Sequence, residues 1–204
     1  MRGTMKISVI LAHPRLGSFN HAIAETAASG LRGAGHTVTV HDLYAEQFDP
    51  LLLHPEIVRD AALPPLVAAH CREIAAADGI VIVHPNWWGM PPAILKGWID
   101  RVLRPGVAYR FLETDSGEGV PIGLLKAQAV IIFNTSNTPA LREQEFFGDP
   151  LERIWRDCIV SFCGVPGFYR RMFGVVVTST EEQRREWLGE IRKRVLEIFP
   201  PGSR

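Results

Sequence analysis

The chain has 204 residues, 47% of them hydrophobic and 22% charged, which is enough to bury one ordinary globular core. Lysine and arginine together number 22, as do aspartate and glutamate, and this balance argues against nucleic acid as the main partner because phosphate binding normally leaves a basic excess. No apolar run approaches the roughly 20 residues that cross a bilayer, so we expect no integral membrane segment.

The first part of the chain predicts two strands around a helix. Residues 1–4 are expected to form a loose leader. Residues 5–12 (MKISVILA) predict a buried strand rather than a signal peptide, because no small-residue cleavage site follows them. After the loop 13–20, apolar residues at helical spacing predict a helix that ends at Gly33 and Gly35. Residues 37–41 alternate like a second strand.

The middle of the chain contains its most informative stretch, residues 79–103. A mixed segment (42–63) with too many prolines for one helix precedes a helix expected at 65–77. The apolar run 80–83 predicts a strand buried on both faces. A loop with two tryptophans and three prolines follows it (HPNWWGMPP, 84–92), and the apolar spacing from Ala93 to Val102 predicts a helix.

The last part of the chain begins with a glycine-rich, acidic turn at 113–119, which we expect to be exposed and mobile. Residues 127–133 predict a fourth strand, and apolar residues between 151 and 162 predict a helix. A fifth strand is expected at 173–178. Residues 179–182 (STEE) resemble a capping box that opens a closing helix, and a tail begins at Pro200.

Five apolar strands that alternate with helices indicate an α/β fold. We expect a doubly wound, five-stranded parallel sheet with helices on both faces, in a single domain that spans residues 1–204. In such a sheet, loops at the carboxyl ends of neighbouring strands lie together and bind ligands. Three polar or aromatic loops occupy these positions: HPRLGSFN (13–20), HPNWWGMPP (84–92) and NTSNTP (134–139).

Each of these loops allows a functional and a plain interpretation. Ser18, Asn20 and free backbone N–H groups suit a phosphate at a helix start, but Ser18 equally suits a helix N-cap. Trp87 and Trp88 suit the wall of a flat ligand or ordinary packing on neighbouring elements. The short polar side chains of 134–139 suit the polar edge of a ring or a plain turn.

Other chemistries lack their motifs. The sequence has no Walker P-loop, no GxGxxG and no GxSxG elbow to present Ser18. Its seven histidines form no HExxH or comparable pair, so no catalytic metal is expected. Three cysteines without metal-ligand spacing predict free thiols in a cytoplasmic protein. These absences favour a bound cofactor that brings its own reactivity.

The motifs resemble those of the flavodoxin-like NAD(P)H:quinone oxidoreductases, the DT-diaphorase group. This group includes bacterial drug-modulator reductases and oxidoreductase subunits ancillary to potassium-efflux transporters. The segments that carry the resemblance are AHPRLGSFN (12–20), DLYAEQFDP (42–50), HPNWWGMPPAILKGWIDRV (84–102) and AYRF (108–111). The resemblance implies a flavodoxin-like fold and a flavin-dependent NAD(P)H dehydrogenase, in which hydride passes from NAD(P)H to the flavin and two electrons then reduce a quinone or similar acceptor.

The resemblance also implies roles for particular residues. The residues expected to hold the phosphate region of the flavin are His13, Ser18, Phe19 and Asn20. Those expected to line its isoalloxazine ring are Pro85, Asn86, Trp87 and Trp88. Those expected in the third flavin loop are Asn134, Thr135, Ser136 and Asn137. Tyr109 matches a family tyrosine that lines the pocket where nicotinamide and quinone bind in turn, and it is the expected catalytic residue.

Three departures from the family pattern bear on the acceptor more than on the flavin. The third loop is usually Thr-Thr-Gly-Gly in the family and is Asn-Thr-Ser-Asn here. The family's active-site histidine has no counterpart, because no histidine follows His84 and Phe147 or a neighbour takes its place. Phe111 stands where the family has a second tyrosine.

The resemblance implies a homodimer in which the partner subunit completes each site. The His13 loop and its SFN motif look like those of FAD-binding members, whereas the short length also fits FMN-binding relatives, so FMN stays open and FAD is favoured. Two alternatives stay open: a flavin-binding regulatory subunit that associates peripherally with a membrane transporter, and a flavodoxin-like electron carrier without a nicotinamide site.

Overall fold

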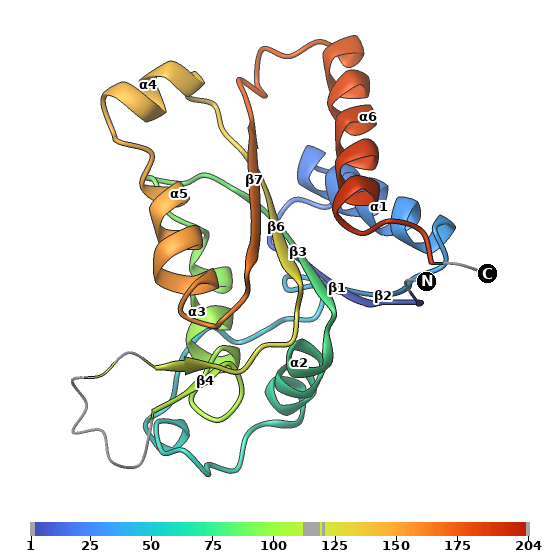
Figure 1. Ribbon diagram of the computed structural model, residues 1–204. Helices are drawn as coiled ribbons and strands as arrows, with labels where there is room; N and C mark the ends of the chain where they lie inside the picture. Colours follow the sequence, from blue (N-terminus) through green and yellow to red (C-terminus); the bar gives the residue numbers. More distant parts are fainter. Residues whose placement is uncertain (1–2, 112–118, 120, 203–204) are drawn as a thin grey trace.

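A computed structural model describes residues 3–111, 119 and 121–202 (Figure 1). Its central sheet has five strands in the order β2-β1-β3-β6-β7, and every neighbouring pair is parallel. The strands are β1 (Lys6–Leu11), β2 (Thr37–Asp42), β3 (Gly79–Pro85), β6 (Ala129–Thr135) and β7 (Gly167–Phe173). This order puts the carboxyl ends of β1, β3 and β6 next to one another, as expected from the sequence.

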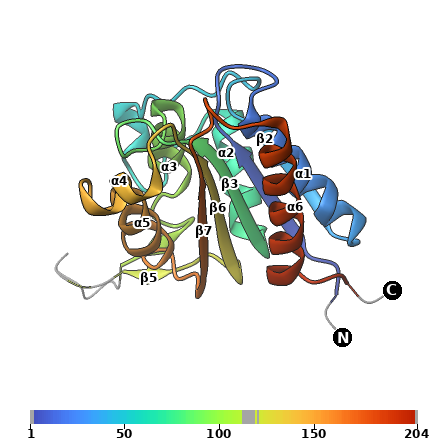
Figure 2. The ribbon, with the colours of Figure 1, turned by 90° about the horizontal axis from the view of Figure 1, so that it is seen from above.

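Helices cover both faces of the sheet (Figures 1 and 2). One face carries α1 (Phe19–Gly33) and α6 (Glu181–Ile198), and the other carries α2 (Pro65–Ala76), α3 (Ala93–Val102) and α5 (Pro150–Arg153). Successive side chains of a strand point to opposite faces, so Val81 and Val83 of β3 join the core under α1 and α6, while Ile80 and Ile82 join the other. The expected flavodoxin-like, doubly wound α/β fold is confirmed.

The other elements lie outside this sheet. They are a short turn, η1 (His54–Glu56), the helix α4 (Ala140–Glu145) and an antiparallel pair, β4 (Tyr109–Arg110) with β5 (Ile122–Gly123). Figure 1 shows the β4–β5 pair at the opposite end of the sheet from α4. The sequence did not predict α4 or this pair. The helix expected at 151–162 forms as α5, which continues in π-helical turns as η2 (Ile154–Val160). The turn expected at 113–119 lies outside the described residues, apart from Gly119.

The strand predicted at 173–178 is wrong. The fifth strand is β7, which ends at Phe173, and the apolar run Val175–Val177 follows it as a loop. β7 lies at the edge of the sheet with half-buried residues, including two arginines, so it lacks the continuous apolar run of a buried strand. The loop instead hydrogen-bonds to the end of β6, where Val176 N–H donates to Ser136 O at 3.1 Å.

The closing helix begins one residue later than the predicted capping box. Thr180 is the N-cap residue, and its hydroxyl accepts the Gln183 N–H at 3.1 Å. The Ser179 hydroxyl donates to Val176 O at 2.7 Å and accepts from Arg184 Nε at 2.9 Å. These bonds tie the loop after β7 to the first turn of α6.

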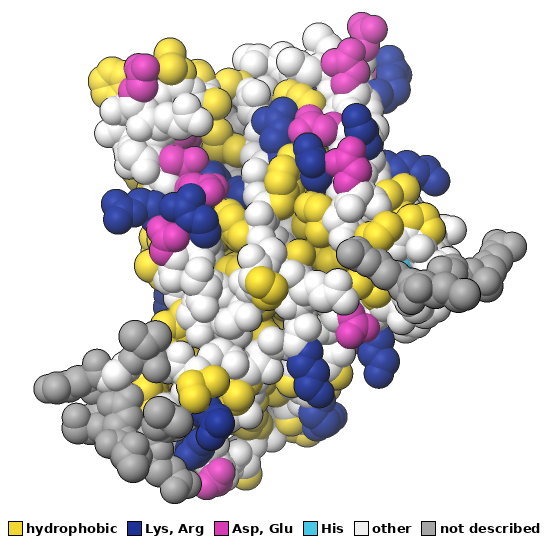
Figure 3. Space-filling view, in the orientation of Figure 1, with side chains coloured by type: hydrophobic (Ala, Val, Ile, Leu, Met, Phe, Trp, Pro, Cys, Tyr) yellow, Lys and Arg dark blue, Asp and Glu magenta, His cyan; other side chains and the backbone are white. Residues whose placement is uncertain are grey.

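The surface carries charges of both signs. On the face shown in Figure 3, basic and acidic side chains lie interspersed. Ion pairs among the described residues include Arg171–Glu190 and Arg156–Asp157, each with a separation of 2.8 Å. Within the described residues, none of the helices combines the length and hydropathy that crossing a bilayer requires.

Candidate functional site

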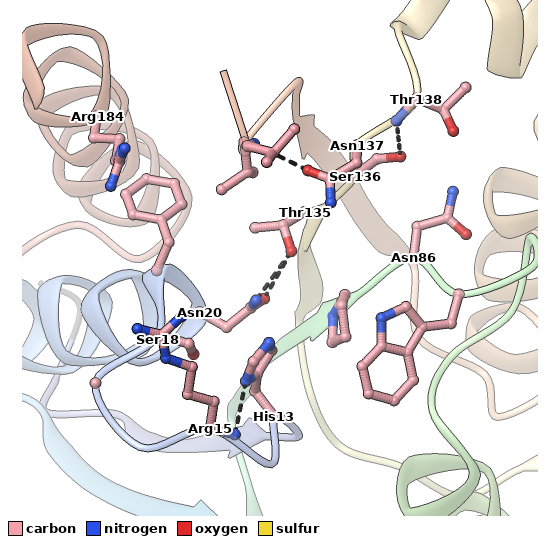
Figure 4. Close-up of a pocket in the computed structure, with 16 residues that line it drawn as sticks. His13, Arg15, Ser18, Asn20, Asn86, Thr135, Ser136, Asn137, Thr138 and Arg184 are labelled. Atoms are coloured by element: carbon pink, nitrogen blue, oxygen red, sulfur yellow. Dashed lines mark hydrogen bonds between the residues drawn. The ribbon is translucent and has the colours of Figure 1, made fainter. Parts of the chain in front are cut away.

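A cavity of about 450 Å³ lies over the carboxyl ends of β1, β3 and β6 (Figure 4). This volume falls in the range of about 300–1,000 Å³ that is usual for small-molecule sites. Figure 4 shows Ser18 and Arg184 toward one end of the cavity and Asn86 toward the other. Of the twelve residues expected to bind the cofactor, ten line it: His13, Ser18, Phe19, Asn20, Pro85, Asn86, Trp87, Thr135, Ser136 and Asn137.

Hydrogen bonds join the three expected loops. Asn20 Nδ2 donates to Thr135 Oγ1 at 2.9 Å, which links the start of α1 to the end of β6. The Asn86 N–H donates to Thr135 O at 2.6 Å, which links the end of β3 to the same residue. Asn20 and Thr135 are both buried. The floor of the cavity is therefore held by contacts among residues that are far apart in sequence.

The end of the cavity near α1 is suited to an anion. Among the described residues, the first-turn N–H groups of Phe19 and Asn20 have no hydrogen-bond acceptor. Such groups and the positive end of the helix dipole favour negative charge. His13 Nδ1 accepts the Arg15 N–H at 3.1 Å, so a neutral His13 carries its proton on Nε2. Burial lowers the pKa of His13 below its ordinary 6.5, which favours this neutral form.

Ser18 occupies the N-cap position of α1, but its side chain makes no capping bond. Its hydroxyl lies 2.9 Å from His21 Nδ1, and His21 Nε2 lies 3.1 Å from Asp42 Oδ2. Ser18 therefore stands at the N-cap position, but its hydroxyl bonds to His21 instead of capping the helix.

The tryptophan loop makes a tight turn at the other end of the cavity. The Trp87 N–H donates to Met90 O at 3.1 Å and the Met90 N–H donates to Trp87 O at 3.0 Å. Trp88 and Gly89 both have positive φ, 58° and 71°, as in a type I′ turn. A bulky residue in this region is uncommon and suggests a functional constraint. At Gly89, a Cβ atom would lie 2.7 Å from Pro150 Cγ, so a larger residue would clash as well.

The two tryptophans face different spaces. Trp87 lines the first cavity, and its ring centroid lies 6.3 Å from that of His13. Trp88 is fully exposed and borders a second cavity of about 430 Å³. Asn86 borders both cavities, and Phe147, at the place expected for the missing family histidine, borders the second. Trp88 therefore shares the second cavity with Asn86 but does not line the first cavity, where the other residues expected to contact the ring lie.

Glu143 of α4 is a buried carboxylate that borders the second cavity. Its Oε1 accepts from Asn86 Nδ2 at 2.9 Å and from Ser136 Oγ at 3.3 Å. Because the carboxylate oxygen requires a donor, this bond orients the Asn86 amide and leaves Asn86 Oδ1 as its free acceptor. That oxygen is buried and has no partner among the described residues. A buried acceptor beside a cavity is suited to a donor on a ligand.

Two buried polar residues lie beneath the cavity. His84 Nδ1–H donates to Pro85 O at 2.8 Å, and His84 Nε2 accepts from Trp155 Nε1 at 3.0 Å. Complete burial lowers the pKa of His84 to about 4, so this histidine is neutral. Asn134 was expected to contact the cofactor, but it is fully buried, accepts from Arg170 Nε at 2.9 Å and does not line the cavity.

Tyr109 lies on β4, away from both cavities of its own chain. Its ring contacts Phe111 and Phe162, with centroid separations of 5.8 and 4.9 Å. Burial raises the pKa of Tyr109 above its ordinary 10.0. Within one chain, Tyr109 therefore cannot act on a molecule in the first cavity.

Sequence reasoning missed several residues of the site. Arg15 and Thr138 lie inside the predicted loops, so loop position alone could have suggested them. His21 is one helical turn after Ser18, a spacing that puts both side chains on one face. No local signal pointed to Glu143, Arg184 or Val176–Val177, which reach the site through the tertiary fold.

A second histidine cluster lies on the other face of β2. His41, Glu46 and His70 each offer a ligand atom within 4.8 Å of the others, a spacing that suits a metal ion. However, Trp98 Nε1–H donates to His70 Nδ1 at 2.9 Å, so a neutral His70 carries its proton on the nitrogen that faces Glu46 at 3.1 Å. A protonated nitrogen cannot ligate a metal.

The other histidine of this cluster is held between two carboxylates. His41 donates to Glu46 at 2.8 Å and to Glu73 at 2.9 Å, so both of its nitrogens carry protons. Burial lowers the pKa of His41, but the bonds to Glu73 and Glu46 outweigh burial and raise it overall. The cluster is therefore an ion-paired network.

Comparison with known proteins agrees with this geometry. A family model described as a flavodoxin-like fold matches residues 5–195. A Haemophilus influenzae protein named an uncharacterized NAD(P)H oxidoreductase is 33% identical over 181 residues, which cover 87% of each chain. NAD(P)H dehydrogenase (quinone) 1 of Cavia porcellus is 32% identical over 222 residues, covering 98% of this chain and 79% of the relative. The solved structure of an NAD(P)H:quinone oxidoreductase from Methanothermobacter marburgensis superposes with a TM-score of 0.80 at 25% identity. The match covers 97% of this chain and 98% of that structure's chain.

Proposed function

The chain belongs to the family with the flavodoxin-like fold, and from this premise we propose that it is a flavin-dependent NAD(P)H dehydrogenase that reduces quinones or similar acceptors. The observation that carries the proposal is the cavity, because it gathers ten of the twelve residues that the resemblance assigns to a flavin. The named activities of the relatives support the same reaction, and the matches extend over most of both chains.

The residues of the cavity fit a flavin along its length. The N–H groups of Phe19 and Asn20 and the guanidinium of Arg15 suit the phosphate end. Trp87 offers an aromatic wall for a flat ring, and the free Asn86 Oδ1 offers an acceptor for a ring N–H. When bound, a flavin supplies the capacity to accept hydride from NAD(P)H and to pass two electrons to an acceptor.

The protein's own tasks in this reaction are binding and orientation. Glu143 fixes the Asn86 amide, and the bonds from Asn20 and Asn86 to Thr135 fix the spacing of the loops. Neutral His13 presents Nε2–H as a donor for an anionic group. Val176 and Val177 give one side of the cavity an apolar lining.

FAD is the proposed form of the cofactor. The cavity is lined both by Ser18 at the start of α1 and by Arg184 on α6 (Figure 4). A second cation at that end suits a diphosphate and the group attached to it. Chromatography of the flavin released by denaturation would identify it, and release of FMN alone would contradict this choice.

We also propose a cytoplasmic homodimer whose partner subunit completes the acceptor site. The support is the position of Tyr109, which does not line the cavity of its own chain. In a dimer, this side chain could instead reach the cavity of the partner subunit. Free Cys71, Cys158 and Cys163 fit a reducing compartment. Sedimentation of the holoprotein tests the dimer, and a monomer with full activity would contradict it.

The central experiment is spectroscopic. The purified or reconstituted protein should show flavin absorbance that NAD(P)H bleaches without oxygen and that a quinone restores. A protein that binds neither FAD nor FMN would overturn the proposal. Flavin binding without steady NAD(P)H oxidation would favour an electron carrier instead.

A further inference from the structure

Ser18, His21 and Asp42 form a hydrogen-bonded line that begins at the cavity wall. Ser18 Oγ lies 2.9 Å from His21 Nδ1, and His21 Nε2 lies 3.1 Å from Asp42 Oδ2. The His21 and Asp42 side chains are mostly buried, with exposed fractions of 18% and 21%. Of the three residues, Ser18 lines the cavity. The line therefore connects the anion end of the cavity to the end of β2.

The chemistry of the three groups determines where their protons lie. Asp42 Oδ1 accepts the N–H groups of Tyr44 and Ala45 at 3.1 and 3.2 Å, which holds the carboxylate as an acceptor. His21 Nε2 must therefore carry the proton that it shares with Asp42. In neutral His21, Nδ1 then has only a lone pair, and the one hydroxyl proton of Ser18 points to it. In this state the hydroxyl has no proton to offer an anion in the cavity.

We propose that His21 couples the binding of a phosphate group at Ser18 to the uptake of one proton. When His21 takes a proton from solvent on Nδ1, it donates to Ser18 Oγ, and the hydroxyl proton is released to turn toward the phosphate. No bond between heavy atoms forms or breaks. The imidazolium stays paired with Asp42 and adds positive charge beside the N-terminus of α1. This inference rests on the proposed function, because the expected ligand is the flavin.

The charged and titratable groups around His21 come from three elements. The loop after β1 contributes Arg15 and His13, whose ring centroid lies 6.3 Å from that of His21. β2 contributes Asp42, and α1 contributes Glu25, one turn after His21. Arginine stays charged throughout the neutral range. Burial lowers the pKa of His13, so His13 stays neutral above its ordinary 6.5. His21 is thus the group assigned to take up the proton.

The test is calorimetric titration of the apoprotein with FAD, repeated in buffers with different ionisation enthalpies. The pH is about 8, the upper end of the range in which histidine usually changes its charge. The buffer dependence of the heat gives the number of protons taken up. FAD is the ligand used because its diphosphate has no proton to gain or lose across this range, whereas the phosphate of FMN loses its second proton at about pH 6. Riboflavin, which lacks phosphate, is the matched ligand control. We expect uptake that approaches one proton with FAD and none with riboflavin. The Kd for FAD should rise by up to about tenfold per pH unit above the histidine range.

Two variants separate this coupling from a structural role. His21→Asn keeps an amide N–H near Ser18 but cannot titrate, so proton uptake should vanish and the Kd should become independent of pH. His13→Gln changes the other histidine near the cavity and should keep the proton uptake. FAD binding by the wild type without proton uptake, or uptake unchanged in His21→Asn, overturns the coupling and leaves the proposed function standing. A protein that binds no flavin overturns both.

Discussion

Two histidine–carboxylate networks occupy opposite faces of β2 and start from adjacent residues. Asp42 points toward α1 and pairs with His21, while His41 points toward α2 and pairs with Glu46 and Glu73. Successive residues of a strand alternate between faces, which is why neighbours in sequence join separate networks. The His21 network ends at Ser18 in the cavity wall, whereas the His41 network ends at the indole of buried Trp98 and the hydroxyl of Ser8.

The difference shows that surroundings, rather than residue type, decide what such a network does. Each end of the His41 network is a protein group, so its bonds contribute to stability. One end of the His21 network borders a cavity, so its protons respond to a ligand. Changes on the α2 face should therefore alter unfolding, and changes at the cavity should alter binding.

The largest expected effect is on the α2 face. His70→Leu removes the acceptor for Trp98 Nε1–H, and Trp98 is 1% exposed. A buried donor without a partner should lower the free energy of unfolding by about 3 kcal/mol, as measured by urea denaturation. His54→Leu, at an exposed histidine, is the control and should change it little. If His70→Leu instead weakens flavin binding and leaves the free energy of unfolding unchanged, the networks on the two faces of β2 do not have separate roles.

The second-largest expected effect is on flavin affinity at the first cavity. Trp87→Ala removes an aromatic wall that is 42% exposed, so flavin affinity should fall about tenfold, or about 1.4 kcal/mol, while apoprotein stability changes little. Flavin fluorescence and urea denaturation measure the two quantities. Trp88→Ala is the matched control and should have a smaller effect, because Trp88 lies outside the first cavity. An unfolded Trp87→Ala protein would favour the packing interpretation.

A smaller effect should depend on pH. The raised pKa of His41 means that its pairing stabilises the protein fully below the ordinary 6.5, and this contribution is lost as the pH rises through the raised value. Burial raises the pKa of Glu73, but its bonds to His41 and Ser8 outweigh burial and lower it, so its contribution is lost as the pH falls below the ordinary 4.5.

His41→Gln should therefore lower the free energy of unfolding most between pH 4.5 and 6.5, by about 1 kcal/mol, and by less at higher pH. Urea denaturation across this range measures the difference. A cost that stays constant with pH would show that the pairing does not depend on the charge of His41.

The smallest effect concerns metal. Because His70 presents a protonated nitrogen to Glu46, Zn²⁺ should change Tm negligibly. A Tm that rises with Zn²⁺ concentration in the wild type but not in His41→Gln would establish a metal site on the α2 face.

Much of the fold could be predicted because it depends on local pattern. The apolar runs of β1, β3 and β6 are buried on both faces, so they are readable without knowledge of their neighbours. The edge strand β7 was misplaced because its first six residues are all half-buried, without alternation, and a more apolar run follows it. The three loops of the site were found for the same reason that the strands were, since they begin where the strands end.

The sequence by itself determined the α/β architecture, the three loops at the carboxyl edge and ten residues of the cavity. The tertiary structure alone decided that Arg184 and Val176 reach the cavity, that Trp88 leaves it, and that Tyr109 lies at the far end of the fold. It also decided that His21 pairs with Asp42 at the end of β2. The physical reason is that the hydrophobic periodicity of a segment indicates only which of its own residues are buried. Hydrogen bonds between distant residues depend also on the register of strands and the packing of helices.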